Sequence, residues 1–521
     1  MTFTKVKSLV LYVVILGCIL ILGCEEKESM ATIEVSYYKE PHRPQYHFSP
    51  EANWMNDPNG MVFYDGEYHL FYQYYPDSTV WGPMHWGHAV SPDMVRWEHL
   101  PIALYPDSLG YIFSGSAVID YDNTSGLGSS DNPPMVAVFT HHDTAGERAN
   151  TKTYQVQSIA YSLDKGRTFT KYHGNPVVTN PGIKDFRDPK VIWHEESRRW
   201  VMMFAAYDKA MIYTSPDLKE WTYASEFGIE GDRRLWECPD IFPIQVEGSE
   251  EEKWILITSI QKEGPNGGTA TSYFIGDFDG TRFIGAPSDQ RWMDYGTDNY
   301  AMVTWSKDRS DDQRVLALGW MSNWQYAQRV PTHPWRSAMT LPRVLTLHKT
   351  SDENYELRSN PVEELEALEV NTRQFKSTKD QSAQIILVDT NDVYTYRIGF
   401  QLDKPITETF TLRLSNRIGE YIDLGYDPRA DQYFLDRTHA GKSDFSDLFA
   451  ARHTAPALSK SRRVNVEVYI DHSSIELFLD DGRVVMTDIY FPSEPLSKIE
   501  LIGNSSEYFG RSSYGELQSI W

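Results

Sequence analysis

The sequence predicts an all-β protein, with a five-bladed β-propeller followed by a C-terminal β-sandwich. Short apolar stretches with a period of two, separated by turn residues, run through nearly the whole chain, as they do in propellers, sandwiches and barrels. Before about residue 345, two kinds of motif recur at intervals of roughly 60 residues, which suits a four-stranded blade. After that point strands continue without these motifs, which indicates a second all-β domain.

The recurring motifs mark the ends and the beginnings of blades. Those that follow a predicted strand are Ser91-Pro92-Asp93, Ser162-Leu163-Asp164, Ser215-Pro216-Asp217 and a weaker copy, Gly276-Asp277-Phe278. Those that open a blade are Asn56-Asp57-Pro58, Phe113-Ser114-Gly115, Arg187-Asp188-Pro189, Glu237-Cys238-Pro239 and Asp298-Asn299-Tyr300. Because the first strand of each blade lines the propeller axis, we expect the five openings to meet at one end of it.

The elements follow in order along the chain. Residues 62–64 and 68–72 flank Asp65-Gly66, a dipeptide typical of a hairpin turn, and 191–193 should pair with 200–204. The predicted organisation is a signal peptide over 1–23, a tether over 24–43, the propeller over 44–345, a linker over 346–368 and the sandwich over 369–521.

The N-terminus has the pattern of an export signal. Lys5 and Lys7 precede an apolar run over 9–22, which is too short to span a bilayer comfortably, and Gly23-Cys24 then leads into an acidic stretch. A small residue before a cysteine at this place is typical of a bacterial lipoprotein, so we expect lipidation of Cys24 and anchoring to a membrane. The alternative is an ordinary signal peptide with an incidental cysteine.

Composition limits the partners. The formal net charge is -24, which disfavours nucleic acid because phosphate binding needs clustered Lys and Arg. Aromatic residues make up 13% of the chain, which suits either an uncharged ligand such as a sugar or a β-rich core. With Cys24 lipidated and Cys18 removed, Cys238 would be left without a partner for a disulfide within the chain. The oligomeric state stays open.

Three blade openings carry a carboxylate, namely Asp57, Asp188 and Glu237, each embedded among apolar or aromatic residues. Converging carboxylates raise one another's pKa, and glycoside cleavage needs one protonated and one ionised carboxyl group. The other interpretations are three turns at strand starts, or a calcium site. The sequence has no contiguous calcium loop and no zinc-ligand spacing, so we expect no metal and no cofactor.

Four motifs resemble the signature blocks of glycoside hydrolase family 32, the β-fructosidases. They are Trp54-Met55-Asn56-Asp57-Pro58-Asn59-Gly60, Phe113-Ser114-Gly115-Ser116, Phe186-Arg187-Asp188-Pro189 and Trp236-Glu237-Cys238-Pro239-Asp240. They occur in the family's order. The similarity continues through 294–301, 319–327 and 334–343, and residues 471–478 resemble the signature of the final sandwich. The resemblance covers about residues 44 to 520.

The resemblance implies a retaining mechanism with three named roles. Asp57 would be the nucleophile that forms a covalent fructosyl intermediate, and Glu237 the general acid and base. Asp188 would stabilise the transition state, and Cys238 would pack beside Glu237 or tune its pKa. The residues implied to line the fructose pocket are Asn56, Gln73, Trp81, Phe113, Ser114, Arg187, Tyr300 and Trp324.

The segments 320–327 and 334–339 look most similar to levanases and exo-inulinases. We therefore expect a fructan substrate, with levan favoured over inulin and inulin over sucrose. The alternatives are a five-bladed arabinan or xylan glycosidase, a sialidase suggested by the turn at 162–169, and a non-catalytic glycan-binding lipoprotein. A sialidase would need a tyrosine nucleophile and an arginine triad.

Overall fold

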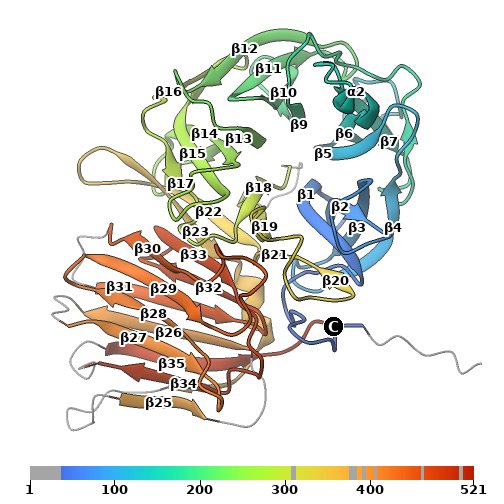
Figure 1. Ribbon diagram of the computed structural model, residues 1–521. Helices are drawn as coiled ribbons and strands as arrows, with labels where there is room; N and C mark the ends of the chain where they lie inside the picture. Colours follow the sequence, from blue (N-terminus) through green and yellow to red (C-terminus); the bar gives the residue numbers. More distant parts are fainter. Residues whose placement is uncertain are drawn as a thin grey trace, which may run out of the picture. The chain divides into compact units, whose positions relative to one another are not determined.

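Five mainly antiparallel sheets surround one axis in the part of the chain that the structure describes, and two further sheets follow them (Figure 1). The structure is a computed structural model that describes residues 37–306, 313–374, 384–389, 395–403, 408–458, 463–503 and 509–521. Residues 38–521 form one compact unit. The predicted signal peptide over 1–23 and Cys24 lie outside the described residues.

The first three propeller sheets each use consecutive strands. They are β1 (Asn53–Tyr64), β2 (Glu67–Tyr75), β3 (His85–Ser91) and β4 (Glu98–Leu104); β5 (Tyr111–Ile119), β6 (Met135–His142), β7 (Gln155–Ser162) and β8 (Thr170–Lys171); and β9 (Phe186–His194), β10 (Arg199–Ala206), β11 (Lys209–Ser215) and β12 (Thr222–Gly228). The hairpins predicted at 62–72 and 191–204 are confirmed as the pairs β1–β2 and β9–β10.

The last two propeller sheets each carry an additional short strand. They are β13 (Trp236–Gln245), β14 (Glu252–Ile260), β15 (Ala270–Phe278), β16 (Phe283–Gly285) and β17 (Arg291–Trp292); and β18 (Tyr300–Thr304), β19 (Val315–Met321), β21 (Ala338–Met339), β22 (Arg343–Lys349) and β23 (Tyr355–Pro361). The short strand β20 (Trp335–Arg336) lies between β19 and β21 in sequence but pairs in parallel with β1, which joins the last blade to the first.

The remaining strands form two six-stranded sheets. The first, in spatial order, is β24 (Glu369–Gln374), β35 (Phe509–Leu517), β26 (Tyr396–Asp403), β31 (Arg463–Ile470), β32 (Ser474–Leu479) and β33 (Val484–Ile489). The second is β25 (Gln384–Asp389), β34 (Lys498–Ile502), β27 (Phe410–Ser415), β28 (Tyr421–Asp427), β29 (Gln432–His439) and β30 (Arg452–Pro456). The predicted fold class, a five-bladed propeller followed by a sandwich, is confirmed.

Buried and half-buried residues alternate along the strands of the sandwich. In β27 every second residue, Phe410, Leu412 and Leu414, is buried, and the residues between them are half-buried. The same period places Val464, Val466 and Val468 of β31 in the same core. Each sheet therefore buries one apolar face against the other, as in a β-sandwich.

The described residues differ from the predicted organisation at two places. Residues 346–361 are not a linker, because β22 and β23 complete the fifth propeller sheet and bury Leu347 and Leu357. In the described end of the predicted tether, 37–43, the first six residues are exposed or half-buried and the last is packed. Arg43 is fully buried, and its guanidinium donates to the carbonyl oxygens of Pro50 and Glu51 at 2.6 Å. The sequence signal was weak in both places, since short strands and single buried arginines leave no periodic pattern.

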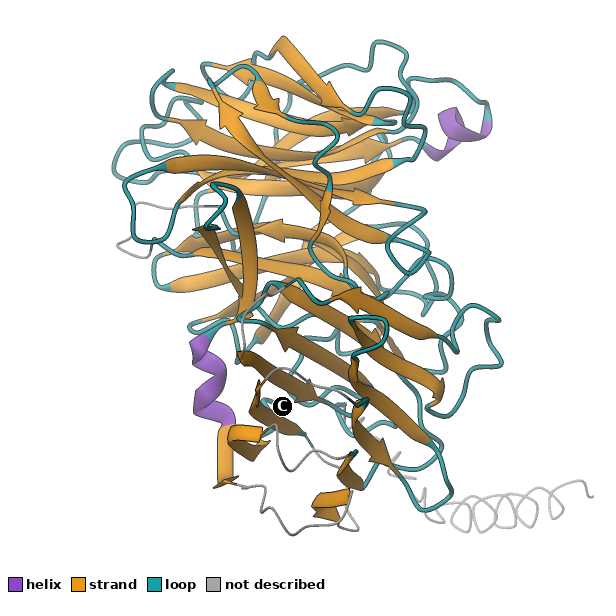
Figure 2. Cartoon of the chain, turned by 90° about the vertical axis from the view of Figure 1, so that its left-hand side faces the viewer, coloured by secondary structure: helices purple, strands orange, loops and turns teal. Residues whose placement is uncertain are grey.

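Helix is scarce among the described residues (Figure 2). It is confined there to α2 (Thr144–Arg148), in the connection between β6 and β7, and the 3-10 helix η1 (Glu363–Leu368), which precedes the sandwich. In the described ranges, no helix has both the length and the apolar character needed to cross a bilayer.

Buried charged groups connect the propeller to the sandwich. Asp294 and Asp298 precede β18 in the propeller, whereas Glu476 and Arg437 belong to the sandwich strands β32 and β29. Arg343 of β22 bonds both Asp294, at 3.1 Å, and Glu476, at 2.7 Å. Arg437 donates to Asp298 at 2.6 Å. Because these groups are withdrawn from water, each charge depends on its partner, and two of the pairs, Arg343 with Glu476 and Arg437 with Asp298, join the two domains.

Candidate active site

The five predicted blade openings do lie at the starts of the five inner strands β1, β5, β9, β13 and β18. Each inner strand has a break in its pairing register at or next to the opening, at 55–58, 112–115, 187–190, 237–240 and 300–303. A bulge inserts an unpaired residue and redirects the side chains beside it. Asp188 and Cys238 accordingly have positive φ, 65° and 45°, which non-glycine residues seldom adopt.

Asp57 is buried and held by three donors. Ser114 Oγ donates to Asp57 Oδ2 at 2.6 Å, and Asn56 Nδ2 donates to Asp57 Oδ1 at 3.0 Å. The Cys238 thiol lies 3.4 Å from Asp57 Oδ2. Burial raises the pKa of Asp57, and the nearby Glu237 charge adds to the rise, while these hydrogen bonds oppose it. The donors fix the carboxylate in place and keep an acceptor-only, ionised state accessible.

Asp188 and Glu237 share one arginine. Arg187 Nη2 donates to Glu237 Oε1 at 2.9 Å, and its Nε lies 3.7 Å from Asp188 Oδ2. The Tyr300 hydroxyl donates a hydrogen bond to Glu237 Oε2. Burial raises the pKa of Asp188 to about 7; the charges of Glu237 and Asp57 add to this rise and Arg187 opposes it.

Cys238 connects the three carboxylates. Its backbone N–H donates to Asp188 Oδ2 at 3.1 Å, its thiol lies 3.7 Å from that oxygen and 3.4 Å from Asp57 Oδ2, and it directly follows Glu237. Burial raises the pKa of the thiol well above its usual value, and all three neighbouring carboxylates add to the effect. The thiol therefore stays protonated and acts as a weak donor rather than as a nucleophile.

The predicted pocket residues fall into two groups. Asn56, Ser114, Arg187 and Tyr300 contact the carboxylates directly. Trp81, Phe113 and Trp324 are half-buried members of the apolar cluster that contains Cys238 and Tyr300. The Trp81 and Phe113 rings meet edge to face, 6.1 Å apart, and Trp324 stacks on Trp54 at 5.8 Å. Gln73 is buried, and its amide donates to the Ile112 carbonyl of the neighbouring blade rather than to a carboxylate.

Sequence reasoning missed two residues at this site. His142 ends β6 and stacks on Phe113 at 4.1 Å with the rings nearly parallel, and burial lowers its pKa. Asp185 accepts from Arg187 Nη1 at 2.6 Å, so it fixes the arginine from the side opposite Glu237. Asp185 lies two residues before a recognised motif, which is a usable signal. His142 has none, because it reaches the site through the pairing of β5 with β6.

Comparison with known proteins agrees with this geometry. The model of the glycosyl hydrolases family 32 N-terminal domain matches residues 47–361, and the model of the family's C-terminal domain matches residues 362–514. The levanase of Bacillus subtilis (strain 168) is 48% identical over 474 residues, which cover 89% of this chain and 69% of the levanase. The extracellular exo-inulinase of Aspergillus awamori is 37% identical over 521 residues, or 93% of this chain and 96% of the inulinase.

Solved structures give the same result. The crystal structure of exo-inulinase from Aspergillus awamori matches with a TM-score of 0.83 and 34% identity, covering 93% of this chain and 100% of that one. The β-fructofuranosidase from Schwanniomyces occidentalis, complexed with fructosyl-erythritol, matches with a TM-score of 0.83 and 32% identity, covering 93% and 99%. The similarity therefore spans both domains, and the chain belongs to glycosyl hydrolase family 32 as a retaining β-fructosidase.

Proposed function

We propose that this β-fructosidase hydrolyses fructans, with levan preferred to inulin and inulin to sucrose. The observation that carries the proposal is the convergence of Asp57, Asp188 and Glu237 around Arg187 and Cys238. The preference for levan rests on the similarity to the Bacillus subtilis levanase. The exo-inulinases among the relatives favour release of single fructose units. Family membership does not favour an arabinan or xylan glycosidase or a non-catalytic binder.

The proposed mechanism is a double displacement. Asp57 attacks the anomeric C2 of the terminal fructosyl unit as the C2–O bond to the leaving group breaks, and Glu237 gives its proton to the departing oxygen. Water then adds to C2, Glu237 takes its proton, and Asp57 leaves as a carboxylate. Two inversions at C2 give overall retention, which requires the two carboxyl groups to lie about 5–5.5 Å apart.

Two contacts of Glu237 determine how it can serve as an acid. Arg187 binds Oε1 as an ion pair, and Arg187 is itself held by Asp185. The Tyr300 hydroxyl on Oε2 can rotate to another acceptor, because a hydroxyl is both donor and acceptor. We infer that the glycosidic oxygen of the substrate replaces Tyr300 at Oε2, while Asp188 accepts hydrogen bonds from sugar hydroxyls.

The substrate assignment can be tested by product analysis. Purified enzyme is incubated with levan, inulin and sucrose separately, and the products are followed by chromatography from the first per cent of conversion. We expect fructose to be the first product from all three, with the highest kcat/KM on levan. Asp57→Asn is the control for contaminating activity. Failure of the enzyme to release fructose from levan and inulin would overturn the fructan assignment.

Removing the hydroxyl of Ser114 should change the pH dependence. The hydrogen bond from Ser114 to Asp57 lowers the pKa of that carboxyl, so Ser114→Ala raises it. Since Asp57 attacks only when it is ionised, the acidic limb of the pH profile of kcat/KM should move to higher pH by about one unit. Ser116→Ala is the matched control, because the Ser116 hydroxyl accepts from the Val191 N–H instead. An unchanged limb in Ser114→Ala would contradict the role of Asp57.

We also propose that the enzyme is exported and held at a membrane by lipidated Cys24. The support is the run of Lys5, Lys7 and the apolar segment before Gly23-Cys24. A lipoprotein cysteine carries several acyl chains, which anchor stably. Labelling of expressing cells with a radioactive fatty acid should mark the protein and leave Cys24→Ser unmarked. Incorporation of the fatty acid into the Cys24→Ser protein would contradict this proposal.

A further inference from the structure

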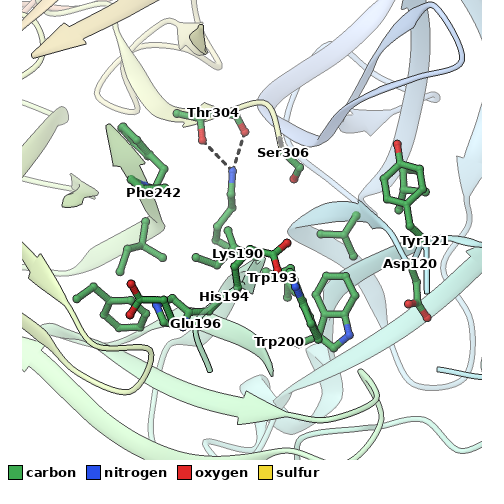
Figure 3. A pocket seen from close by; sticks show the side chains of 18 of the residues that line it. Asp120, Tyr121, Lys190, Trp193, His194, Glu196, Trp200, Phe242, Thr304 and Ser306 are labelled. Atoms are coloured by element: carbon green, nitrogen blue, oxygen red, sulfur yellow. Dashed lines mark hydrogen bonds between the residues drawn. The ribbon is translucent and has the colours of Figure 1, made fainter. Parts of the chain in front are cut away.

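A second cavity lies along the inner strands β5, β9, β13 and β18, on the C-terminal side of their blade openings. It has a volume of about 470 Å³ and is lined by residues 118–122, 190–196, 241–243 and 304–306, together with residues of β10, β14 and β15 (Figure 3). That volume is within the range of small-ligand sites, roughly 300–1,000 Å³. Asp188 and Glu237 lie near the N-terminal ends of β9 and β13, and Asp57 lies on β1, which does not contribute to the lining. None of the three lines the cavity.

A buried ion pair separates this cavity from the catalytic carboxylates. Lys190 Nζ donates to Asp240 Oδ2 at 3.0 Å. It also donates to Thr304, at 2.7 Å for the carbonyl oxygen and 3.0 Å for the hydroxyl (Figure 3). Lys190 and Thr304 line both this cavity and the small pocket that contains Asp188 and Cys238. Because these side chains occupy the axis, a sugar chain bound in the active site does not reach the second cavity through the propeller.

Rigid aromatic side chains form the walls. Trp193 and Trp200 of the third blade meet edge to face at 5.1 Å, and the Trp200 indole N–H is fixed to the Thr124 hydroxyl at 2.8 Å. On the fourth blade, Trp254 packs at 5.0 Å from Phe278. Trp193 and Trp254 are only half-buried. Fixed aromatic faces that keep some exposure suit the C–H faces of a sugar ring.

The exposed polar groups of the lining suit a ligand rich in hydroxyl donors. Glu195, Glu196 and Glu252 are exposed at the cavity, and within the described residues none of the three takes part in a salt bridge. Carboxylates are acceptors only, so they match hydroxyl donors and repel an anion. Lys190 is committed to Asp240 and Thr304 and is not available to an anionic ligand.

We infer that this cavity is a second, non-catalytic binding site for a fructan chain, an inference that rests on the proposed fructan substrate. The site binds a different stretch of the polymer, or another polymer chain, from the one being cleaved. A second attachment point raises the effective concentration of chain ends near Asp57, so it lowers the KM for a polymer. It does nothing for a disaccharide, which cannot reach both sites.

Kinetics on substrates of two lengths test the inference. Trp254→Ala should raise the KM for levan at least about threefold and leave kcat on levan and both constants on sucrose unchanged. Because Trp254 also packs in the core, the double variant Glu195→Ala/Glu196→Ala, in which both residues are exposed, should give the same pattern without a risk to folding. Trp221→Ala is the matched control, since Trp221 is half-buried on the same blade as Trp193 but does not line the cavity.

Calorimetric titration with a levan-derived oligosaccharide gives an independent measurement. In an Asp57→Asn background, which prevents hydrolysis, we expect two binding events per chain, and one after adding Trp254→Ala or the double glutamate change. One event in all these proteins, or an unchanged KM for levan in the double variant, would overturn the second site. Failure of the fructan assignment is seen separately, as the absence of fructose release from levan by the wild-type enzyme.

Discussion

Glu237→Gln should lower kcat on levan or sucrose by on the order of 10³-fold while preserving the fold, because it removes the proposed proton donor for a poor leaving group. An aryl β-fructofuranoside, whose leaving group needs no proton, should still react with Asp57 in this variant. The fructosyl intermediate should then accumulate, since no base activates water. Azide, which needs no base, should restore turnover and give β-fructosyl azide.

Asp57→Asn should behave differently in the same assay. The amide keeps the shape of the side chain but cannot displace a leaving group, so activity on both natural and aryl substrates should fall by on the order of 10⁴-fold. Glu226→Gln, on the exposed strand β12, is the control and should retain full activity. If Glu237→Gln hydrolysed sucrose at the wild-type rate, or if Asp57→Asn kept its activity, the two roles would be wrong.

Arg437→Met should destabilise the enzyme by about 3–5 kcal/mol, because it leaves buried partners without their charge. Besides its bond to Asp298, the Arg437 guanidinium donates to the Phe449 carbonyl at 2.7 Å and the Tyr326 hydroxyl at 2.9 Å. Asp298 lies two residues before Tyr300, so the same change should also disturb the hydrogen bond to Glu237. Thermal unfolding and kcat measured on one preparation test both effects.

The stability that Arg437→Met loses should be larger at high pH than at low pH. Burial raises the pKa of Asp298, and Arg437 opposes the rise, so removing Arg437 raises this pKa further. When a carboxyl group has a higher pKa in the folded than in the unfolded state, the folded protein loses stability as the pH increases through the folded-state pKa. Arg437→Met should therefore be less stable at pH 8 than at pH 5, relative to wild type, and Asp298→Asn in the same chain should recover part of the loss.

Arg413, an arginine in a partly exposed ion pair, is the matched control for the loss of stability in Arg437→Met. Arg413 also pairs with an aspartate, at 2.7 Å, but its side chain is about a third exposed. Exposed pairs contribute about 0–1 kcal/mol, so Arg413→Met should unfold within a few degrees of wild type. Equal stability of the two variants would show that the buried network does not hold the domains together.

Much of the fold could be predicted because propeller blades are local units. The register breaks at Asp57, Asp188 and Glu237 all coincide with short motifs of two to four residues, and such a motif repeats visibly in one sequence. The three candidate carboxylates could be proposed from the sequence for the same reason. Each is embedded in its own motif, and the topology of the repeat brings the motifs together.

The rest depends on contacts between residues that are far apart in sequence. Arg437 meets Asp298 across 139 positions, and Arg343 meets Glu476 across 133, so neither pair leaves a local pattern. The blocks around Asp294 and Asp471 could be recognised as family signatures, but only the structure shows Asp294 in the interface between domains. The same holds for Lys190 and Asp240, which belong to strands β9 and β13 of different sheets.

Identification of the residue that carries the sugar tests the central claim most directly. Glu237→Gln enzyme is mixed with an aryl β-fructofuranoside, quenched at low pH, digested and analysed by mass spectrometry. The mechanism predicts one added fructosyl unit, as an ester, on the peptide that contains Asp57, and none in an Asp57→Asn/Glu237→Gln protein. A fructosyl ester on Asp188, or no labelled peptide while the aryl group is released in a burst, would contradict it.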